Sequence, residues 1–164
     1  MNSSKDQFLQ LVRHRVKFPL FLLTKLPAAY FSGVRVTQIE EDKAVVTVPY
    51  KWFSQNPFKS TYFACLAMAA ELSTGVLAMM HTYKSNPTIS MLVIGLQAAY
   101  FKKATGITTF TCGQGLDINQ TIEDALASGE GRTIKIKSTG KNEDGELVAE
   151  FFITWSFKAK KSLA

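Results

Sequence analysis

One acidic residue lies alone in a long apolar segment and is the first candidate for chemistry. From Ser60 to Met80 the chain is rich in Ala, Met and Leu, and Glu71 is its only charged residue. A carboxylate in such surroundings is either partly desolvated, with a raised pKa, or held ionised by hydrogen-bond donors. Both conditions suit a general base or a nucleophile. The alternative is a structural carboxylate that faces solvent, contacts a subunit or binds a backbone group.

Features on either side of this segment could assist a reaction. Asn56 precedes it, and its amide could orient a substrate or a water molecule, although Asn-Pro is also an ordinary turn dipeptide. The first N–H groups of a helix lack partners within the helix, so those around Tyr62 could hold a carbonyl oxygen or an oxyanion. Lys102 and Lys103 follow a β-type run and could bind phosphate or simply solubilise a turn.

The histidines and cysteines indicate no catalytic or metal site. His14 stands between two arginines, and His81 lies about 15 Å from Glu71 by helical rise. Cys65 and Cys112 form neither a CxxC motif nor a cluster with histidine, so we expect no metal site and no disulfide. Two buried thiols and the lack of a signal-peptide pattern lead us to expect a cytoplasmic protein.

The residues that must position Glu71 belong to a series of helices and strands. The pattern predicts an amphipathic helix over 5–26, broken or restarted at Pro19 and ended by Pro27. The other expected elements are strands at Val34–Glu40 and Ala44–Pro49, a loop at Trp52–Lys59, a long buried helix at Ser60–His81 capped by Ser60 or Thr61, strands at Ile89–Lys102 and Thr108–Gln114, a short helix at Ile118–Ala127, and strands at Arg132–Thr139 and Leu147–Phe157. This order predicts the α+β class, with a curved, largely antiparallel sheet around one long central helix.

Composition sets the wider limits. The 164 residues are 46% hydrophobic and 20% charged, which suits a single domain over 1–164 with an N-terminal helical extension at 1–30. The net charge of +6 favours anionic partners such as nucleic acid, a membrane surface or a phosphate-bearing molecule. The basic residues are not interleaved with aromatic residues as in RNA-binding proteins, so no nucleic acid partner is expected. Residues 5–26 could make weak contact with a membrane surface, whereas an unpartnered Glu71 disfavours a transmembrane reading of Ser60–Met80.

Three segments together resemble the hotdog-fold thioesterase superfamily, most closely an uncharacterised bacterial branch. Asn56 and Glu71 keep the fifteen-residue separation between an asparagine and a helical acidic residue in small thioesterases of the phenylacetyl-CoA type. The other two segments are 100–106, YFKKATG, and 144–149, DGELVA, which are similar to a strand end and to the last hairpin of that family. The likeness covers roughly residues 34–158.

The resemblance implies hydrolysis of acyl-CoA thioesters. Glu71 takes the role of base or nucleophile, Asn56 the polar loop position, and the N–H near Ala64 the amide that polarises the thioester carbonyl. The family's His-Gly-Gly turn falls on the sequence Tyr62, Phe63 and Ala64. This departure keeps open the alternative of a non-catalytic module that binds acyl-CoA or fatty acid.

The resemblance also indicates the substrate contacts and the assembly. Lys59, Lys102 or Lys103 would meet the phosphates of coenzyme A, which is part of the substrate, and no separate cofactor is expected. The partner is an acyl-CoA or fatty acyl ligand. A hotdog protomer usually pairs with a second copy, so a homodimer or a dimer of dimers is implied.

Overall fold

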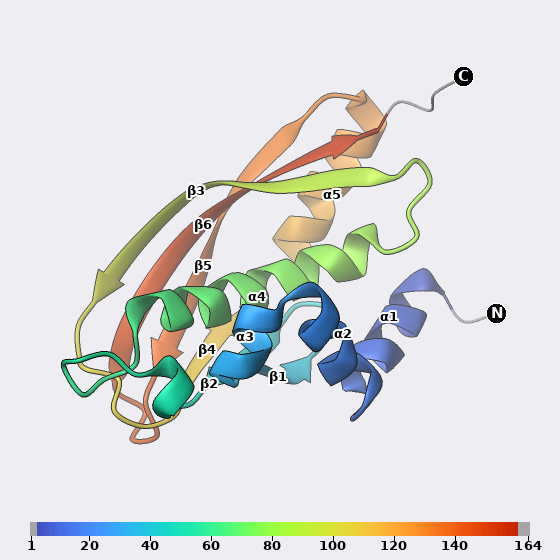
Figure 1. Cartoon of the computed structure of the whole chain (residues 1–164). Helices are drawn as coiled ribbons and strands as arrows, with labels where there is room; N and C mark the ends of the chain where they lie inside the picture. Colours follow the sequence, from blue (N-terminus) through green and yellow to red (C-terminus); the bar gives the residue numbers. More distant parts are fainter. Residues whose placement is uncertain (1–2, 161–164) are drawn as a thin grey trace.

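In the computed structural model, which describes residues 3–160, six strands form one antiparallel sheet in the order β1-β2-β4-β5-β6-β3 (Figure 1). The strands are β1 (Arg35–Ile39), β2 (Ala44–Val48), β3 (Ile89–Tyr100), β4 (Thr108–Cys112), β5 (Arg132–Lys141) and β6 (Leu147–Ala159). The long strands β3, β5 and β6 curve over one side of the central helix. The predicted α+β class and the antiparallel sheet around one long helix are confirmed.

The central helix α4 (Phe63–Thr82) lies along the concave side of the sheet. By length and composition alone this helix could cross a membrane, but most of it is buried inside the chain, as in a core helix. The helix begins after the predicted caps, because Ser60 and Thr61 belong to the preceding turn. The N–H of Thr61 donates to the carbonyl of Ala104 at 2.7 Å, and Tyr62 occupies the N-cap position.

Three N-terminal helices replace the single predicted one. They are α1 (Ser4–Arg13), α2 (Lys17–Lys25) and α3 (Pro27–Ser32). The break falls at 14–16 rather than at Pro19, which lies in the first turn of α2, where no backbone N–H is needed. Pro27 likewise begins α3 instead of only ending a helix, as its position N1 allows. The apolar side chains of Phe8, Phe18 and Leu22 are buried against the body of the protein.

The last helix, α5 (Gly115–Ser128), is longer than the predicted one and starts three residues earlier. A Cβ atom at Gly115 would lie 2.1 Å from the carbonyl oxygen of Glu41, so only glycine fits at this close approach. The loop before α4 contains a short 3₁₀ helix at Trp52–Ser54. Hydrophobic periodicity encodes neither the contact of Gly115 with Glu41 nor this short 3₁₀ helix.

The core between sheet and helix contains aromatic side chains from the sheet and both small and larger aliphatic side chains from the helix. Phe151, Trp155 and Phe157 of β6 are buried and share one face of the strand, and Trp155 contacts α4. Two polar pairs lie in this core, since Trp155 Nε1 donates to Thr74 Oγ1 at 2.9 Å and the hydroxyl oxygens of Ser73 and Ser138 are 2.7 Å apart. These contacts fix the part of α4 that carries Glu71.

Candidate functional site

Glu71 lines an apolar cavity between α4 and the joint of α2 and α3. The cavity has a volume of about 230 Å³ and is lined by Lys25, Leu26, Pro27, Ala28, Ala29, Met68, Glu71 and Leu72. Within residues 3–160 no hydrogen bond or ion pair reaches the Glu71 carboxylate, although Lys25 lines the same cavity. Burial raises the pKa of this carboxyl group. Of the states that the sequence left open, the structure thus has the desolvated carboxyl group with a raised pKa.

Gly75 and Trp155 support the carboxylate from the other side. A Cβ atom at Gly75 would lie 3.1 Å from Oε1 of Glu71 and 3.3 Å from the Trp155 ring. The carboxylate therefore rests one turn further along α4, where the missing side chain of glycine leaves room. Trp155 is not among the predicted site residues, and the only signal for it in the sequence is its place in an alternating strand, which turns it inward.

A partly exposed strip of α4 runs from Glu71 to the start of the helix. Ala64, Ala67 and Met68 share this face with Glu71, and each is partly exposed. Ala64 precedes Glu71 by seven residues, which is about 10 Å along the axis. Its N–H has no acceptor within the helix, since the first bonds are those donated to the Tyr62 carbonyl by Cys65 and Leu66. The strip thus carries a hydrogen-bond donor at one end and a carboxylate at the other.

Asn56 is occupied by its own turn. Its Oδ1 accepts the N–H groups of Phe58 at 2.9 Å and Ser60 at 3.2 Å, and its Nδ2 donates to Ser60 Oγ at 3.1 Å. These bonds hold the loop that leads into α4. In this structure Asn56 shapes the backbone and does not point a free amide towards Glu71.

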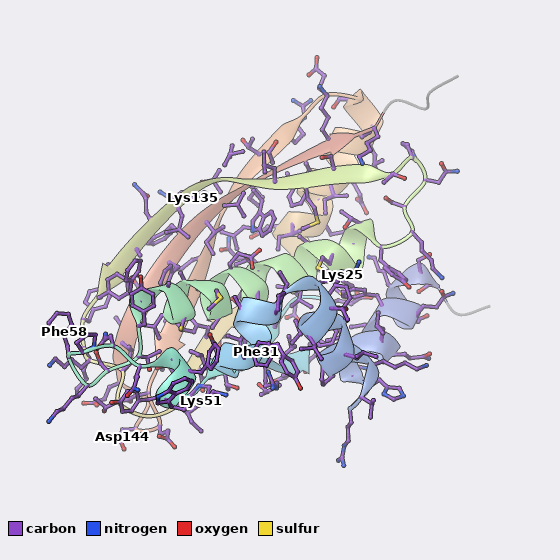
Figure 2. All side chains as sticks on the ribbon, in the orientation of Figure 1. Lys25, Phe31, Lys51, Phe58, Lys135 and Asp144 are labelled. Carbon is purple, nitrogen blue, oxygen red and sulfur yellow. The ribbon has the colours of Figure 1, made fainter. Side chains whose placement is uncertain are left out.

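A second cavity, of about 580 Å³, brings most of the other predicted residues together. It is lined by Asn56, Pro57, Phe58, Ser60, Thr61, Tyr62, Phe63, Leu66 and residues 100–104. Glu71 is not among them, because at 3.6 residues per turn it is rotated by about 80° from Phe63 and about 140° from Leu66. Figure 2 shows the separation, with Phe58 at one end of the molecule and Lys25 beside the α2–α3 joint.

The three predicted lysines surround this loop cavity unequally. Lys102 pairs with Glu146 and holds the pKa of that carboxyl group below its usual value. Lys103 Nζ donates to the carbonyl of Phe58 at 3.3 Å. Lys59 lies in the adjoining turn with a left-handed φ of 57° and is exposed, but it lines neither cavity.

The edge strand β3 presents apolar side chains that the rest of the described chain covers only in part. Leu96 pairs with Ile153, and Tyr100 pairs with Ala149, both of which are buried on the helix side of the sheet. Paired residues point to the same face, so Leu96 and Tyr100 also face the helix side. They are nevertheless 49% and 48% exposed.

Comparison with known proteins agrees with this architecture. A family model described as a domain of unknown function (DUF4442) matches residues 18–157. No protein of curated function shows significant sequence similarity to the chain.

Solved structures cover nearly the whole chain. A protein of unknown function from Pseudomonas aeruginosa, described as a probable thioesterase, is 19% identical with a TM-score of 0.72, covering 98% of this chain and 99% of that one. A protein of unknown function from Chlorobaculum tepidum is 14% identical with a TM-score of 0.76, covering 96% and 98%. A thioesterase from Haemophilus influenzae is 12% identical with a TM-score of 0.61, covering 88% and 92%.

Proposed function

Because the chain belongs to the DUF4442 family and has the hotdog fold of thioesterase structures, we propose that it hydrolyses acyl-CoA thioesters. The observation that carries the proposal is the Glu71 carboxylate, which is desolvated, unpaired among residues 3–160, and set at the wall of an apolar cavity. A group of this kind is more basic than an exposed carboxylate and remains available to accept a proton.

In the proposed reaction the ionised Glu71 takes a proton from water as the water oxygen attacks the thioester carbonyl carbon. The carbon–sulfur bond then breaks, and the proton passes to the departing sulfur, which gives a carboxylic acid and free coenzyme A thiol. Direct attack by the carboxylate on the carbonyl carbon is the alternative route. The Ala64 N–H would hold the developing oxyanion, a device worth about 3–4 kcal/mol. In this arrangement the thioester carbonyl and the attacking water lie between the Ala64 N–H and the Glu71 carboxylate, which keeps its place against Gly75.

We place the acyl chain in the apolar cavity beside Glu71 and the coenzyme A phosphates near Lys102 and Lys103. The two lysines line the loop cavity next to the first turn of α4, where the strip leading to Glu71 begins. Lys59, which is exposed in the adjoining turn, is a third cation within this region. No cofactor is needed beyond the coenzyme A of the substrate.

We also propose that a second copy of the chain covers the exposed concave side of β3. Leu96 and Tyr100 offer that copy an apolar surface next to a strand edge with free backbone groups. Multi-angle light scattering of the full chain should give twice or four times the mass of 18.2 kDa. A monomeric mass at micromolar concentration would contradict this assembly.

The function is tested by thiol release from a series of acyl-CoA substrates of increasing chain length. The wild-type protein should release thiol, and both Glu71→Gln and Glu71→Ala should abolish the release. Glu123→Gln, which removes an exposed carboxylate on α5, is the matched control and should keep the wild-type rate. Equal rates in the Glu71 variants and the control would exclude Glu71 from the mechanism.

The alternative, a non-catalytic module that binds acyl-CoA or fatty acid, is favoured by one observation. Asn56 uses both side-chain atoms within its own turn and so offers no polar contact to a reacting group. Native mass spectrometry of freshly purified protein separates the two functions. A retained intact acyl-CoA without turnover indicates the binding module, whereas turnover that requires Glu71 indicates the enzyme.

A further inference from the structure

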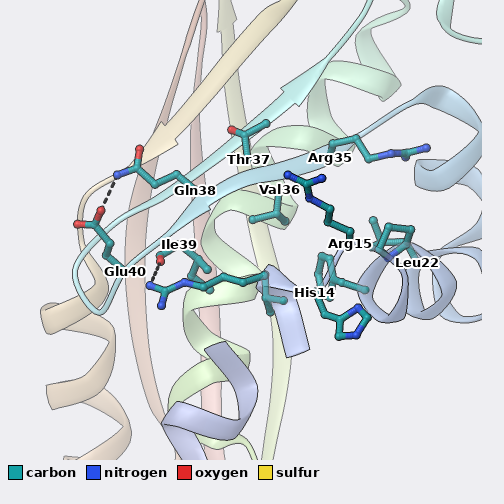
Figure 3. Close-up of a pocket in the computed structure, with 13 residues that line it drawn as sticks. His14, Arg15, Leu22, Arg35, Val36, Thr37, Gln38, Ile39 and Glu40 are labelled. Atoms are coloured by element: carbon teal, nitrogen blue, oxygen red, sulfur yellow. Dashed lines mark hydrogen bonds between the residues drawn. The ribbon is translucent and has the colours of Figure 1, made fainter. Parts of the chain in front are cut away.

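A third cavity lies between the α1–α2 corner and strand β1, and it shares no lining residue with the two cavities above. Its volume is about 390 Å³, and we call it the β1 groove (Figure 3). It is lined by Val12, Arg13, His14, Arg15, Phe18, Pro19, Leu22 and the run from Arg35 to Glu40. The groove thus joins an apolar floor to three arginines, which come from α1, from the turn between α1 and α2, and from β1.

Two of these arginines are fixed by the protein itself. Arg13 Nη2 donates to the carbonyl of Ile39 at 2.9 Å. Arg35 Nη1 donates to the carbonyls of Val34 at 2.7 Å and Tyr30 at 3.2 Å, and its guanidinium lies 4.7 Å from the centre of the Tyr30 ring. These neutral partners leave both positive charges uncompensated.

Arg15 is the cation available to a ligand. Figure 3 shows its side chain extending from the α1–α2 corner towards β1. Among residues 3–160 no hydrogen bond or ion pair engages its guanidinium. His14 Nδ1 accepts the N–H groups of Val16 and Lys17, which leaves Nε2 free to donate. The only acidic residue of the groove, Glu40, accepts a hydrogen bond from Gln38 at 2.6 Å.

The surface beside the groove is apolar and basic. Val16 is 66% exposed and Leu20 is 55% exposed, although the other apolar residues of α1 and α2 mostly face the core. Lys17 lies on the same helix α2 and is exposed. Exposed aliphatic side chains next to unpaired cations suit a surface that meets phosphate groups and hydrocarbon together.

We propose that the β1 groove binds the phosphate of an anionic phospholipid headgroup, with Val16 and Leu20 in contact with the acyl region of the membrane. Arg15 closes on the phosphate, while Arg13 and Arg35 supply fixed positive charge around it. A phospholipid fits better than an acidic peptide added to the edge of β1, because the Arg13 guanidinium already occupies the Ile39 carbonyl at that strand.

The proposal is tested by flotation of the full-length protein with phosphatidylcholine vesicles that contain or lack phosphatidylglycerol. Wild-type protein should float only with the anionic vesicles. Arg15→Ala should weaken binding about fivefold, as expected for one basic residue at an anionic surface. Arg132→Ala is the matched control, because it removes one positive charge from β5, which is separated from β1 by β2 and β4. It should change binding less than twofold. Leu20→Ser should weaken binding several-fold without changing the charge.

Three results would overturn the proposal. If Arg15→Ala and Arg132→Ala weaken binding to anionic vesicles equally, the protein is attracted by its net charge and not by the groove. Binding of inorganic phosphate that depends on Arg15, without flotation of the wild-type protein, would assign the groove to a soluble phosphate. Arg15-dependent binding of an acidic peptide without flotation would assign it to a protein partner. Unchanged thermal unfolding of Arg15→Ala should accompany the test, since no partner of Arg15 is lost.

Discussion

Replacement of Gly75 by alanine should separate the stability of the protein from its proposed activity. The new Cβ atom would lie 3.1 Å from Oε1 of Glu71 and 3.3 Å from the Trp155 ring. The Trp155 ring is held by its bond to Thr74, whereas the end of the Glu71 side chain can rotate. The carboxylate is therefore the group that moves.

The effect on stability should be small and favourable. Alanine gains up to about 1 kcal/mol over glycine within a helix, which corresponds to about 2–4 °C in Tm for a domain of this size. The close contact with Trp155 offsets part of this gain, so we expect Tm to change by between about 0 and +3 °C. Thermal unfolding followed by circular dichroism measures this shift.

The effect on activity should be large. Displacing a catalytic group by about 1 Å costs on the order of a hundredfold in rate, and we expect thiol release from acyl-CoA to fall between about tenfold and a hundredfold. Gly113→Ala is the control, because its Cβ would meet no atom within 4 Å. A Gly75→Ala protein with raised Tm and the wild-type rate would refute the placement of the reaction at Glu71.

Two further predictions concern ionisation. The pKa of Glu71 is raised above its usual value of 4.5, so ionisation of Glu71 costs folding stability as the pH rises from about 4.5 through its folded pKa. Glu71→Gln should therefore raise Tm more at pH 8 than at pH 4, and an equal shift at both pH values would contradict the burial of this charge. Cys65 and Cys112 are buried, and burial raises the pKa of Cys112 to about 11. Neither thiol should react with a thiol reagent until the protein is unfolded with guanidinium chloride, and rapid labelling of the folded protein would disagree with the structure.

The core of the fold could be predicted because its signals are long and repeated. The alternation from Leu147 to Phe157 determines which side of β6 is buried, and the uninterrupted apolar run around Glu71 defines the central helix. The boundaries were less predictable, since they depend on single hydrogen bonds. The N–H of Thr61 donates to the carbonyl of Ala104, more than forty residues away, and α4 therefore begins after Thr61.

The site was predictable only in part for a similar reason. Glu71 stood out because a charge in an apolar helix is rare, but its neighbour Trp155 comes from a strand that only the tertiary structure brings close. Asn56 had the right separation from Glu71 in sequence, yet its amide is satisfied locally by Phe58 and Ser60. Spacing along the chain does not show where a side chain finds its hydrogen bonds.

The two edge strands of the sheet, β1 and β3, differ in whether they can pair with a strand of another chain. At β1 the helical corner and Arg13 obstruct the strand, whereas the twelve residues of β3 end the sheet without such cover among residues 3–160. When two chains join through β3, the uncovered edge strand of each chain is therefore paired with that of the other. The outer edges of the joined sheets are then the two obstructed β1 strands. Association through strand edges therefore stops at two copies and does not extend into a filament.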